Sequence, residues 1–161
     1  MHNEGKHELT EVLAVLLGET VTLKFMAQGF HWNVKGKDFS EYHRFFGKIY
    51  EELEEAIDLT GENIRKMGVD APFTLGDFLT LSPFEAKGIG SDPIQMSRAL
   101  YEANVYVLET LNQAFAYATA CNSQGVANFL ADRIDTHEKL HWQLGAIIGN
   151  DFSPEPSFSD I

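Results

Sequence analysis

Apolar residues recur at intervals of three and four along two stretches in the first half of the chain, a spacing typical of amphipathic helices. The first stretch predicts a helix from near Leu9 to Trp32 or Val34. The second predicts a helix over about residues 39–67. The apolar positions expected to face a core are Leu9, Val12, Leu13, Leu16, Leu17, Val21 and Phe25 in the first helix, and Tyr42, Phe45, Phe46, Ile49, Leu53, Ile57 and Ile64 in the second.

The second half of the chain shows the same periodicity after a connection that contains several Pro and Gly residues. Residues 69–92 interrupt the pattern, with one short helical turn expected around Leu75–Leu79. The pair Asp92-Pro93 is a strong helix start, because a capping side chain precedes Pro at the first helical position. The helices predicted there span Pro93 to about Cys121 and about Ser123 to Gly149, with apolar faces at Leu100, Val107, Leu111 and Phe115, and at Phe129, Ile134, Leu140 and Leu144.

These elements predict an all-α protein, since no stretch of the chain shows the convincing alternation of apolar and polar residues that marks a strand. Four long helices joined by short, long and short connections predict an antiparallel four-helix bundle with one long crossover, which is the ferritin-like connectivity. The crossover carries the short helix. With 161 residues the chain is expected to form a single domain, with flexible tails at residues 1–7 and 150–161.

The chain is strongly acidic, with 24 acidic residues against 12 basic ones and a formal net charge of −12. Such a chain repels DNA and anionic membrane surfaces, so a cation is the more natural partner. The single cysteine, Cys121, excludes an internal disulfide. The sequence contains neither a signal-peptide pattern nor an apolar run of membrane-spanning length, and we therefore expect a soluble, cytoplasmic protein.

One stripe of the helix predicted over residues 39–67 carries side chains that can bind a metal ion. Positions three or four residues apart fall on one face of a helix. Along this stripe they are His43, Gly47, Glu51, Glu54, Asp58 and Glu62. Imidazole together with carboxylate is a ligand set for first-row metals such as Fe(II) and Zn(II). A solvated acidic face is the alternative interpretation of the same spacing.

A second hypothesis places a di-iron site inside the bundle of one chain. Such a site uses a Glu-x-x-His motif from each of two helices and one Glu from each of the other two. In this sequence the second motif is broken, because Ser40 stands where a Glu should precede His43 by three residues. The residues that do fit are Glu138-x-x-His141, Glu19 and Glu109.

A third hypothesis is a zinc hydrolase. The segment from His137 to His141 matches the H-E-x-x-H motif, in which two His bind zinc and the Glu, here Glu138, is the general base. The residues that follow His141 offer only carboxylates as a third ligand, and Lys139 stands beside the base. The alternative is that both histidines lie on the helix surface or in an interface.

A longer pattern extends over nearly the whole chain: HWNVKG-x-x-F from His31, then His43, Asp58 and Glu62, then D-x-x-x-x-H-E-K-x-x-W ending at Trp142. In this pattern the chain resembles the Dps family of mini-ferritins. The resemblance implies a hollow shell of twelve subunits, in which Fe(II) is oxidised by hydrogen peroxide or oxygen and stored as ferric oxyhydroxide.

The resemblance also assigns residues to roles. It implies that the metal ligands are His31, His43, Asp58 and Glu62. Zn(II) is an expected competitor for the same ligands. Trp32 and Trp142 match family aromatics that are thought to absorb stray oxidising equivalents, which would make Trp32 a redox neighbour of the site. Simple packing is the alternative role for both.

Three features depart from the family pattern. Gly47 stands where the family commonly has Asp, so a second iron should be bound weakly. Ser123, Gln124 and Asn128 stand where acidic residues often line an entry pore, so an acidic iron funnel is not expected there. The N-terminus offers Lys6 among several Glu, where DNA-binding members carry a Lys-rich tail, and DNA binding is therefore not expected.

Helix geometry adds an expectation about assembly. A turn near residues 35–38 makes the first two helices antiparallel, so His31 lies beside the start of the second helix, where His43 stands. Asp58 comes about 15 residues later, roughly 20 Å farther along that helix at 1.5 Å per residue. No side chain spans this gap. A shared metal site therefore requires His31 and His43 from one subunit, and Asp58 and Glu62 from its neighbour across a twofold axis.

Overall fold

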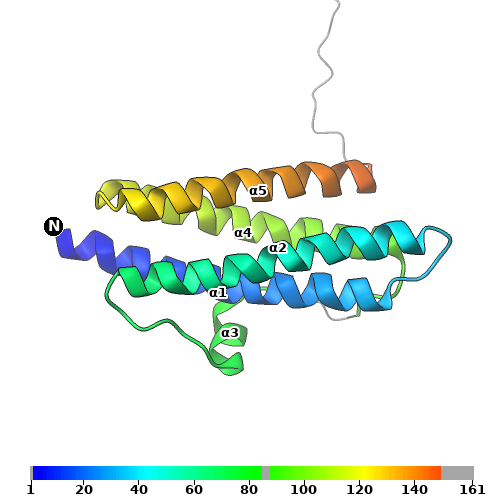
Figure 1. Ribbon diagram of the computed structural model, residues 1–161, viewed down its shortest axis with the longest axis horizontal. Helices are drawn as coiled ribbons and strands as arrows, with labels where there is room; N and C mark the ends of the chain where they lie inside the picture. The colour runs from blue at the N-terminus through cyan, green and yellow to red at the C-terminus, as the bar shows by residue number, and fades with distance from the viewer. Residues whose placement is uncertain (1, 85–87, 150–161) are drawn as a thin grey trace, which may run out of the picture.

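The computed structural model describes residues 2–84 and 88–149, and this part of the chain is helical without any β-strand (Figure 1). The helices are α1 (His2–Asn33), α2 (Phe39–Lys66), α3 (Leu75–Leu81), α4 (Pro93–Ala120) and α5 (Gln124–Ile148). The predicted all-α architecture is confirmed, including the short helix inside the long connection. Among the described residues, no helix combines the length and the apolar character that a membrane span requires.

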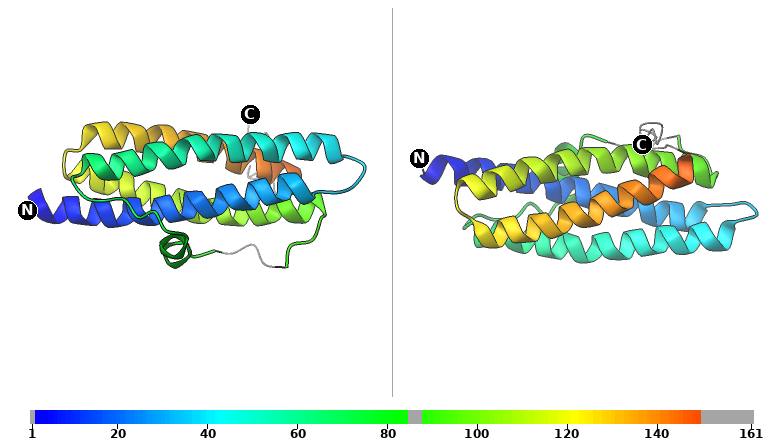
Figure 2. Two further views of the ribbon diagram at one scale, coloured as in Figure 1. Left: turned by 60° about the horizontal axis from the view of Figure 1, so that its bottom comes forward. Right: turned by 90° about the horizontal axis from the view of Figure 1, so that it is seen from above.

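The four long helices form an antiparallel bundle of two hairpins (Figures 1 and 2). Helix α1 packs against α2, α4 packs against α5, and α1 also contacts α4. The connection from α2 to α4 runs along the outside of the bundle and carries α3, which packs on α1. This is the predicted bundle with one long crossover.

The core of the bundle is built from the apolar stripes of the four long helices. Burying a large apolar side chain contributes about 1.5–3 kcal/mol to the stability of a fold. Two predicted core positions are wrong, because Phe25 and Phe115 are 53% and 37% exposed. In α1 the buried stripe passes through Leu23, Met26 and Ala27 and leaves Phe25 at its edge. Fully buried residues include Leu9, Leu13, Leu16, Phe46, Leu53, Ile64, Leu100, Leu111, Leu130 and Leu144.

Helix α1 begins earlier than the sequence pattern predicts. Residues 2–7, expected to form a flexible tail, are helical in the structure. A β-carbon placed on Gly5 would lie 3.4 Å from the β-carbon of Cys121 at the end of α4. The first turns of α1 therefore pack against a neighbouring helix, a tertiary contact that apolar periodicity does not reveal. The other predicted tail, residues 150–161, lies outside the described residues.

The short connection between α1 and α2 determines where the histidines lie. Gly36 has a φ of +130°, a backbone conformation that residues with a side chain adopt only with strain. Its carbonyl accepts a hydrogen bond from the N–H of Phe39 (3.1 Å). The N–H of Lys35 donates to the carbonyl of Ser91 (3.0 Å), which ties the turn to the residues before α4. The last turn of α1 thus lies beside the first turns of α2.

Two helix ends agree closely with the sequence. The carboxylate of Asp92 accepts a hydrogen bond from the N–H of Gln95 (3.0 Å), and Pro93 is the first residue of α4. Gly149 ends α5 with a left-handed φ of +76°. Capping residues therefore predicted these boundaries better than apolar periodicity predicted the start of α1.

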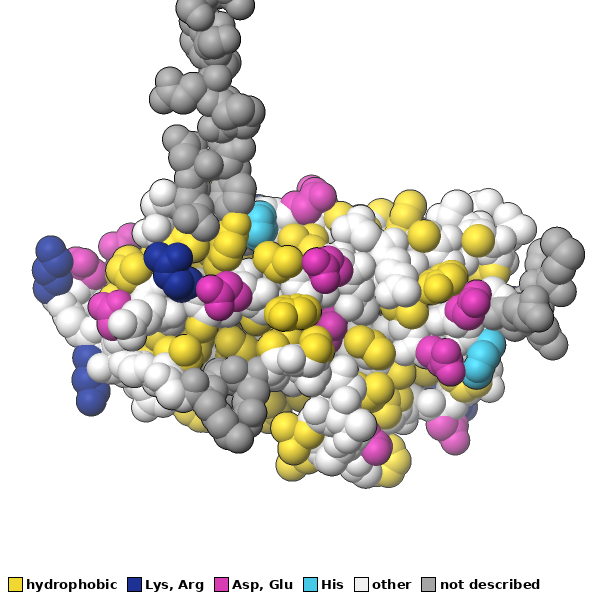
Figure 3. Space-filling model, turned by 180° about the vertical axis from the view of Figure 1, so that it is seen from behind, with side chains coloured by type: hydrophobic (Ala, Val, Ile, Leu, Met, Phe, Trp, Pro, Cys, Tyr) yellow, Lys and Arg dark blue, Asp and Glu magenta, His cyan; other side chains and the backbone are white. Residues whose placement is uncertain are grey.

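The face of the bundle opposite to that in Figure 1 mixes acidic and apolar side chains (Figure 3). Acidic side chains are scattered across it, and basic side chains lie mainly at one end of the molecule. On this face, therefore, positive charge is not spread along the bundle.

Candidate metal centre

The α1–α2 hairpin brings two histidine rings into direct contact. His31, in the last turn of α1, stacks on His43 of α2 with ring centroids 3.7 Å apart and ring planes 15° from parallel. Nδ1 of His31 lies 2.5 Å from the carbonyl oxygen of His43, and Nδ1 of His43 lies 2.6 Å from the carbonyl oxygen of His31. A carbonyl only accepts hydrogen bonds, so each Nδ1 carries the proton and donates. Each ring therefore keeps Nε2, with its lone pair, as a ligand atom.

Gly47 is needed for this arrangement. A β-carbon at this position would lie 3.0 Å from Nδ1 and 3.1 Å from Cε1 of His31, which is tighter than ordinary packing. The imidazole of His31 therefore lies against the bare backbone of α2. Two aromatic side chains complete the enclosure: Phe39 stacks on His43 with centroids 5.0 Å apart, and Tyr50 meets His31 edge-on at 5.2 Å. Phe39 is the last residue of the HWNVKG-x-x-F pattern, which did not assign it this role, and Tyr50, seven residues after His43, was not singled out from the sequence.

The two histidines line a surface pocket of about 510 Å³. Its lining also includes Phe39, Ser40, Arg44, Gly47, Lys48 and Glu51. Asp58 and Glu62 do not line it; both are exposed farther along α2. Among the described residues of one chain, no three His, Cys, Asp or Glu side chains gather closely enough to hold a metal ion. One chain thus brings together His31 and His43 but neither of the carboxylates predicted to join them.

Both tryptophans of the pattern lie at the surface of the single chain. Trp32, which follows His31 in α1, is 65% exposed, and Trp142 of α5 is 63% exposed. Neither tryptophan is therefore packed inside the single chain.

Among the residues that the structure describes, the candidate ligands of the intrachain di-iron site do not gather into a cluster. Glu19 is buried, and the hydroxyl of Thr110 donates a hydrogen bond to its Oε1 (2.9 Å). The other candidate carboxylates, Glu109 and Glu138, are exposed. Glu19 is therefore the one candidate carboxylate that is buried. Burial raises its pKa to about 7, against the hydrogen bond from Thr110 and with a smaller contribution from the charge of Glu109.

Replacing Glu19 by Gln should stabilise the protein at alkaline pH. The folded-state pKa lies above the unfolded one, so the favourable contribution of the protonated acid is complete below about pH 4.5 and is lost as the pH rises through 7. Gln keeps the shape without ionising, so the unfolding free energy of Glu19→Gln should exceed that of the parent protein by about 1–3 kcal/mol at pH 8. Urea denaturation at pH 8 and pH 5 measures this, and an equal gain at both pH values would refute it.

The H-E-x-x-H motif does not form a zinc site. His137 is buried; its Nδ1 donates to Oδ1 of Asn104 (2.6 Å), and its Nε2 accepts from Nη2 of Arg133 (3.0 Å). Burial, followed by the charge of Arg133, lowers the pKa of His137 to about 3. Both ring nitrogens are thus occupied by the protein itself. His141 is only partly buried and stacks on Tyr101 with centroids 4.4 Å apart.

Arg133 extends this buried polar network to α2. Its guanidinium forms an ion pair with Glu52, with one contact of 3.1 Å between Nη2 and Oε2. Asn104 also donates from Nδ2 to the carbonyl oxygen of His137 (3.0 Å). The network therefore joins α2, α4 and α5. It corrects the expectation that His137 lies on the helix surface or in an interface.

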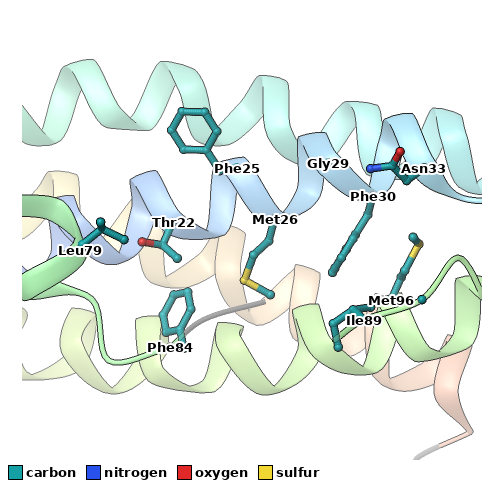
Figure 4. Close-up of a pocket in the computed structure, with 11 residues that line it drawn as sticks. Thr22, Phe25, Met26, Gly29, Phe30, Asn33, Leu79, Phe84, Ile89 and Met96 are labelled. Atoms are coloured by element: carbon teal, nitrogen blue, oxygen red, sulfur yellow. The ribbon is translucent and has the colours of Figure 1, made fainter. Parts of the chain in front are cut away.

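A second, apolar pocket of about 370 Å³ lies between α1, α4 and the segment that precedes α4 (Figure 4). Met26, Phe30 and Met96 extend into the space between the two helices. Among the described residues that line this pocket, none is a His, Cys, Asp or Glu. This pocket therefore lacks the ligands that a metal centre requires.

Comparisons with known proteins agree with this geometry. A family model for the ferritin-like domain matches residues 10–151. DNA protection during starvation protein 2 of Bacillus anthracis is 25% identical over 141 residues, covering 88% of this chain and 97% of that protein. The crystal structure of a Dps protein from Bacillus brevis is similar with a TM-score of 0.85 and 26% identity, covering 90% of this chain and 97% of that one.

A Dps protein from Vibrio cholerae, described as one of the ferritin-like diiron-carboxylate proteins, shares the fold with a TM-score of 0.85. It is 24% identical, covering 89% of this chain and 90% of that one. The family match extends over most of the sequence, and the Dps structures share the fold of the bundle. The chain therefore belongs to the ferritin-like domain family and, within it, to the Dps proteins.

Proposed function

We propose that this protein oxidises Fe(II) at sites formed between two subunits and stores the product as ferric mineral inside a shell. The observation that carries the proposal is the histidine pair. Both Nδ1 atoms are committed to backbone carbonyls, so the two Nε2 atoms are preset as ligands. A pair of imidazoles fixed in this way is half of a metal site, and it needs carboxylates from elsewhere.

Asp58 and Glu62 of a second subunit are the proposed carboxylates. They stand one turn apart on α2, are exposed, and lie roughly 20–30 Å along the helix from His43. A twofold axis that pairs α2 with its copy brings the carboxylates of each chain to the histidines of the other and makes two equivalent sites. Dps relatives support a homo-oligomer, and we propose the twelve-subunit shell of that family.

In this proposal iron is the substrate of the site. Carboxylate oxygens and imidazole nitrogens suit Fe(II), and Zn(II) competes for the same set without being oxidised. Two Fe(II) ions and one hydrogen peroxide react with two protons to give two Fe(III) and two waters. Because both electrons enter the peroxide together, the hydroxyl radical that a single Fe(II) would release is avoided. Oxygen is the alternative oxidant.

Fe(II) oxidation by the apoprotein tests the function directly. Fe(II) and hydrogen peroxide are mixed with the assembled protein while ferric absorbance and particle size are followed. We expect rapid oxidation that Zn(II) inhibits and that the double variant His31→Ala/His43→Ala abolishes. Oxidation no faster than in buffer would overturn the proposal. A zinc hydrolase would bind Zn(II) without any iron chemistry.

The first turn of α5 bears on iron entry. It contains no acidic residue; Gln124 and Asn128 are exposed there, next to Ser123 at the N-cap position. If the threefold pore of the family forms here, its lining offers amide and hydroxyl dipoles in place of carboxylates. We therefore propose that iron reaches the cavity without an acidic funnel at this position.

The assembled protein should not retard duplex DNA at physiological salt. Non-specific DNA binding depends on Lys and Arg that neutralise phosphates, and each chain carries a net charge of −12. Acidic side chains are also scattered over the face drawn in Figure 3. A gel-shift assay measures the result, with added Mg²⁺ as the control for bridging cations. Retardation without such cations would contradict the prediction.

A further inference from the structure

The pocket beside the histidine pair contains one carboxylate, Glu51. It stands two turns after His43 on the stripe of α2 that also includes Gly47. Between them on this stripe stands Gly47, which has no side chain and has the ring of His31 against its backbone. Among the described residues, Glu51 is therefore the one carboxylate that lines this pocket from the same chain.

The direction in which side chains leave a helix points Glu51 toward the pocket. Cα–Cβ bonds tilt toward the helix N-terminus, so the side chain of Glu51 covers the turn that precedes it, at the level of Gly47. The ring of His31 lies over this glycine, so a side chain of Glu51 that points this way points toward that ring, and the pocket of about 510 Å³ includes His31, Gly47 and Glu51 in its lining. Glu51 is exposed and forms no hydrogen bond or ion pair with any residue that the structure describes. Its carboxylate is free to turn toward the two imidazoles.

The other charged residues of the pocket set the strength of this interaction. Arg44 and Lys48 are exposed on the same helix and line the same pocket. Lys48 stands three residues before Glu51, a spacing at which the two side chains can pair weakly in solution. A metal ion must displace that pairing and also fix the rotamers of a long side chain. A metal held partly by Glu51 is therefore bound less tightly than one held by shorter, less mobile ligands.

We propose that Glu51 supplies the carboxylate of a second metal position at the His31–His43 pair, in place of the one that Gly47 does not offer. The ligand is a divalent first-row cation, bound by imidazole nitrogen and a carboxylate oxygen. This proposal rests on the proposed function, since it adds a second ion to the same site. The two ions of each site are then unequal, and Glu51 controls the weaker one.

Titration with Co(II) tests the proposal, because its visible absorption reports bound metal without any redox step. The assembled full-length protein should bind two Co(II) per chain, one tightly and one more weakly. Glu51→Gln should weaken the second ion by at least about tenfold and leave the affinity for the first within about twofold. The matched control is Glu41→Gln, which removes the same charge from α2 but does not line this pocket, and it should bind both ions as the parent protein does. Circular dichroism checks that both variants keep their helices.

The outcomes separate the two proposals. If the parent protein binds Co(II) no better than His31→Ala/His43→Ala, the metal site itself is wrong. If the parent binds one Co(II) through the histidines, or if Glu51→Gln keeps both ions at unchanged affinity, the role of Glu51 is overturned while the proposed function stands. An equal loss in Glu41→Gln would show that general negative charge on α2, and not the pocket, holds the second ion.

Discussion

Two inactive variants should regain iron oxidation when their subunits are mixed. The double variant His31→Ala/His43→Ala lacks the imidazoles of every site, and Asp58→Ala/Glu62→Ala lacks the carboxylates. In a mixed dimer, one of the two interface sites combines the intact histidines of one chain with the intact carboxylates of the other. Random reassembly of equal amounts makes half of the dimers mixed, so about a quarter of the sites and of the parent activity should return.

The measurement is the initial rate of Fe(II) oxidation after the two variants are disassembled together and reassembled. Each variant taken through the same treatment alone is the control for residual activity, and the parent protein is the control for recovery of the shell. A site contained in one chain predicts no recovery in the mixture. Hybrids that stay inactive while the parent recovers would therefore refute the interface site.

The fold was predictable because burial alone determines most of it. The apolar stripes of α2 and α4, together with Asp92 and Pro93, were sufficient to place those helices and the crossover between them. The start of α1 was not predictable, since His2 to His7 are held in a helix that packs at Gly5 against Cys121. Such contacts depend on how neighbouring helices are aligned along their axes, and the pattern of apolar residues does not determine this alignment.

Part of the candidate site could likewise be predicted from the sequence, and part could not. The contact between His31 and His43 follows from the short α1–α2 turn, and helix length puts Asp58 out of their reach. The packing of His31 against Gly47 did not follow, because the family pattern marks position 47 only as the place of a missing ligand. In the structure Gly47 makes room for an imidazole.

The buried network was also missed. Asn104 and His137 are 33 residues apart, and Glu52 and Arg133 are 81 apart, so their contacts require α2, α4 and α5 to be in register. The H-E-x-x-H motif marked His137 as a candidate zinc ligand, not as a member of a buried hydrogen-bond network. The signal that could have identified the network is the presence of polar residues, Asn104 and Arg133, on the buried faces of two helices.

Acid should destabilise this protein through His137. In the folded protein its pKa is about 3, against 6.5 for an ordinary histidine, so the unfolded chain binds more protons between these values. The stability that depends on neutral His137 is therefore complete above about pH 6.5 and is lost as the pH falls toward 3. A protonated ring would also meet the positive charge of Arg133, from which Nε2 now accepts a hydrogen bond.

The comparison that isolates this effect uses the double variant Asn104→Leu/His137→Leu. Removing both hydrogen-bonding partners together avoids leaving one of them unpaired in the core, and Arg133 keeps its ion pair with Glu52. Both proteins also carry Glu19→Gln, because Glu19 titrates in the opposite sense over the same range. Carboxylates elsewhere are common to both proteins and cancel in the difference.

Between pH 6.5 and pH 4.5 the protein with His137 should lose about 2–3 kcal/mol more unfolding free energy than the Asn104→Leu/His137→Leu protein. Urea denaturation at a fixed protein concentration measures both slopes. A single Asn104→Leu replacement should instead cost about 1–3 kcal/mol at pH 7, because it leaves Nδ1 of His137 without its acceptor. If the unfolding free energies of the protein with His137 and of the Asn104→Leu/His137→Leu protein fall in parallel with pH, His137 is not the group that makes the bundle sensitive to acid.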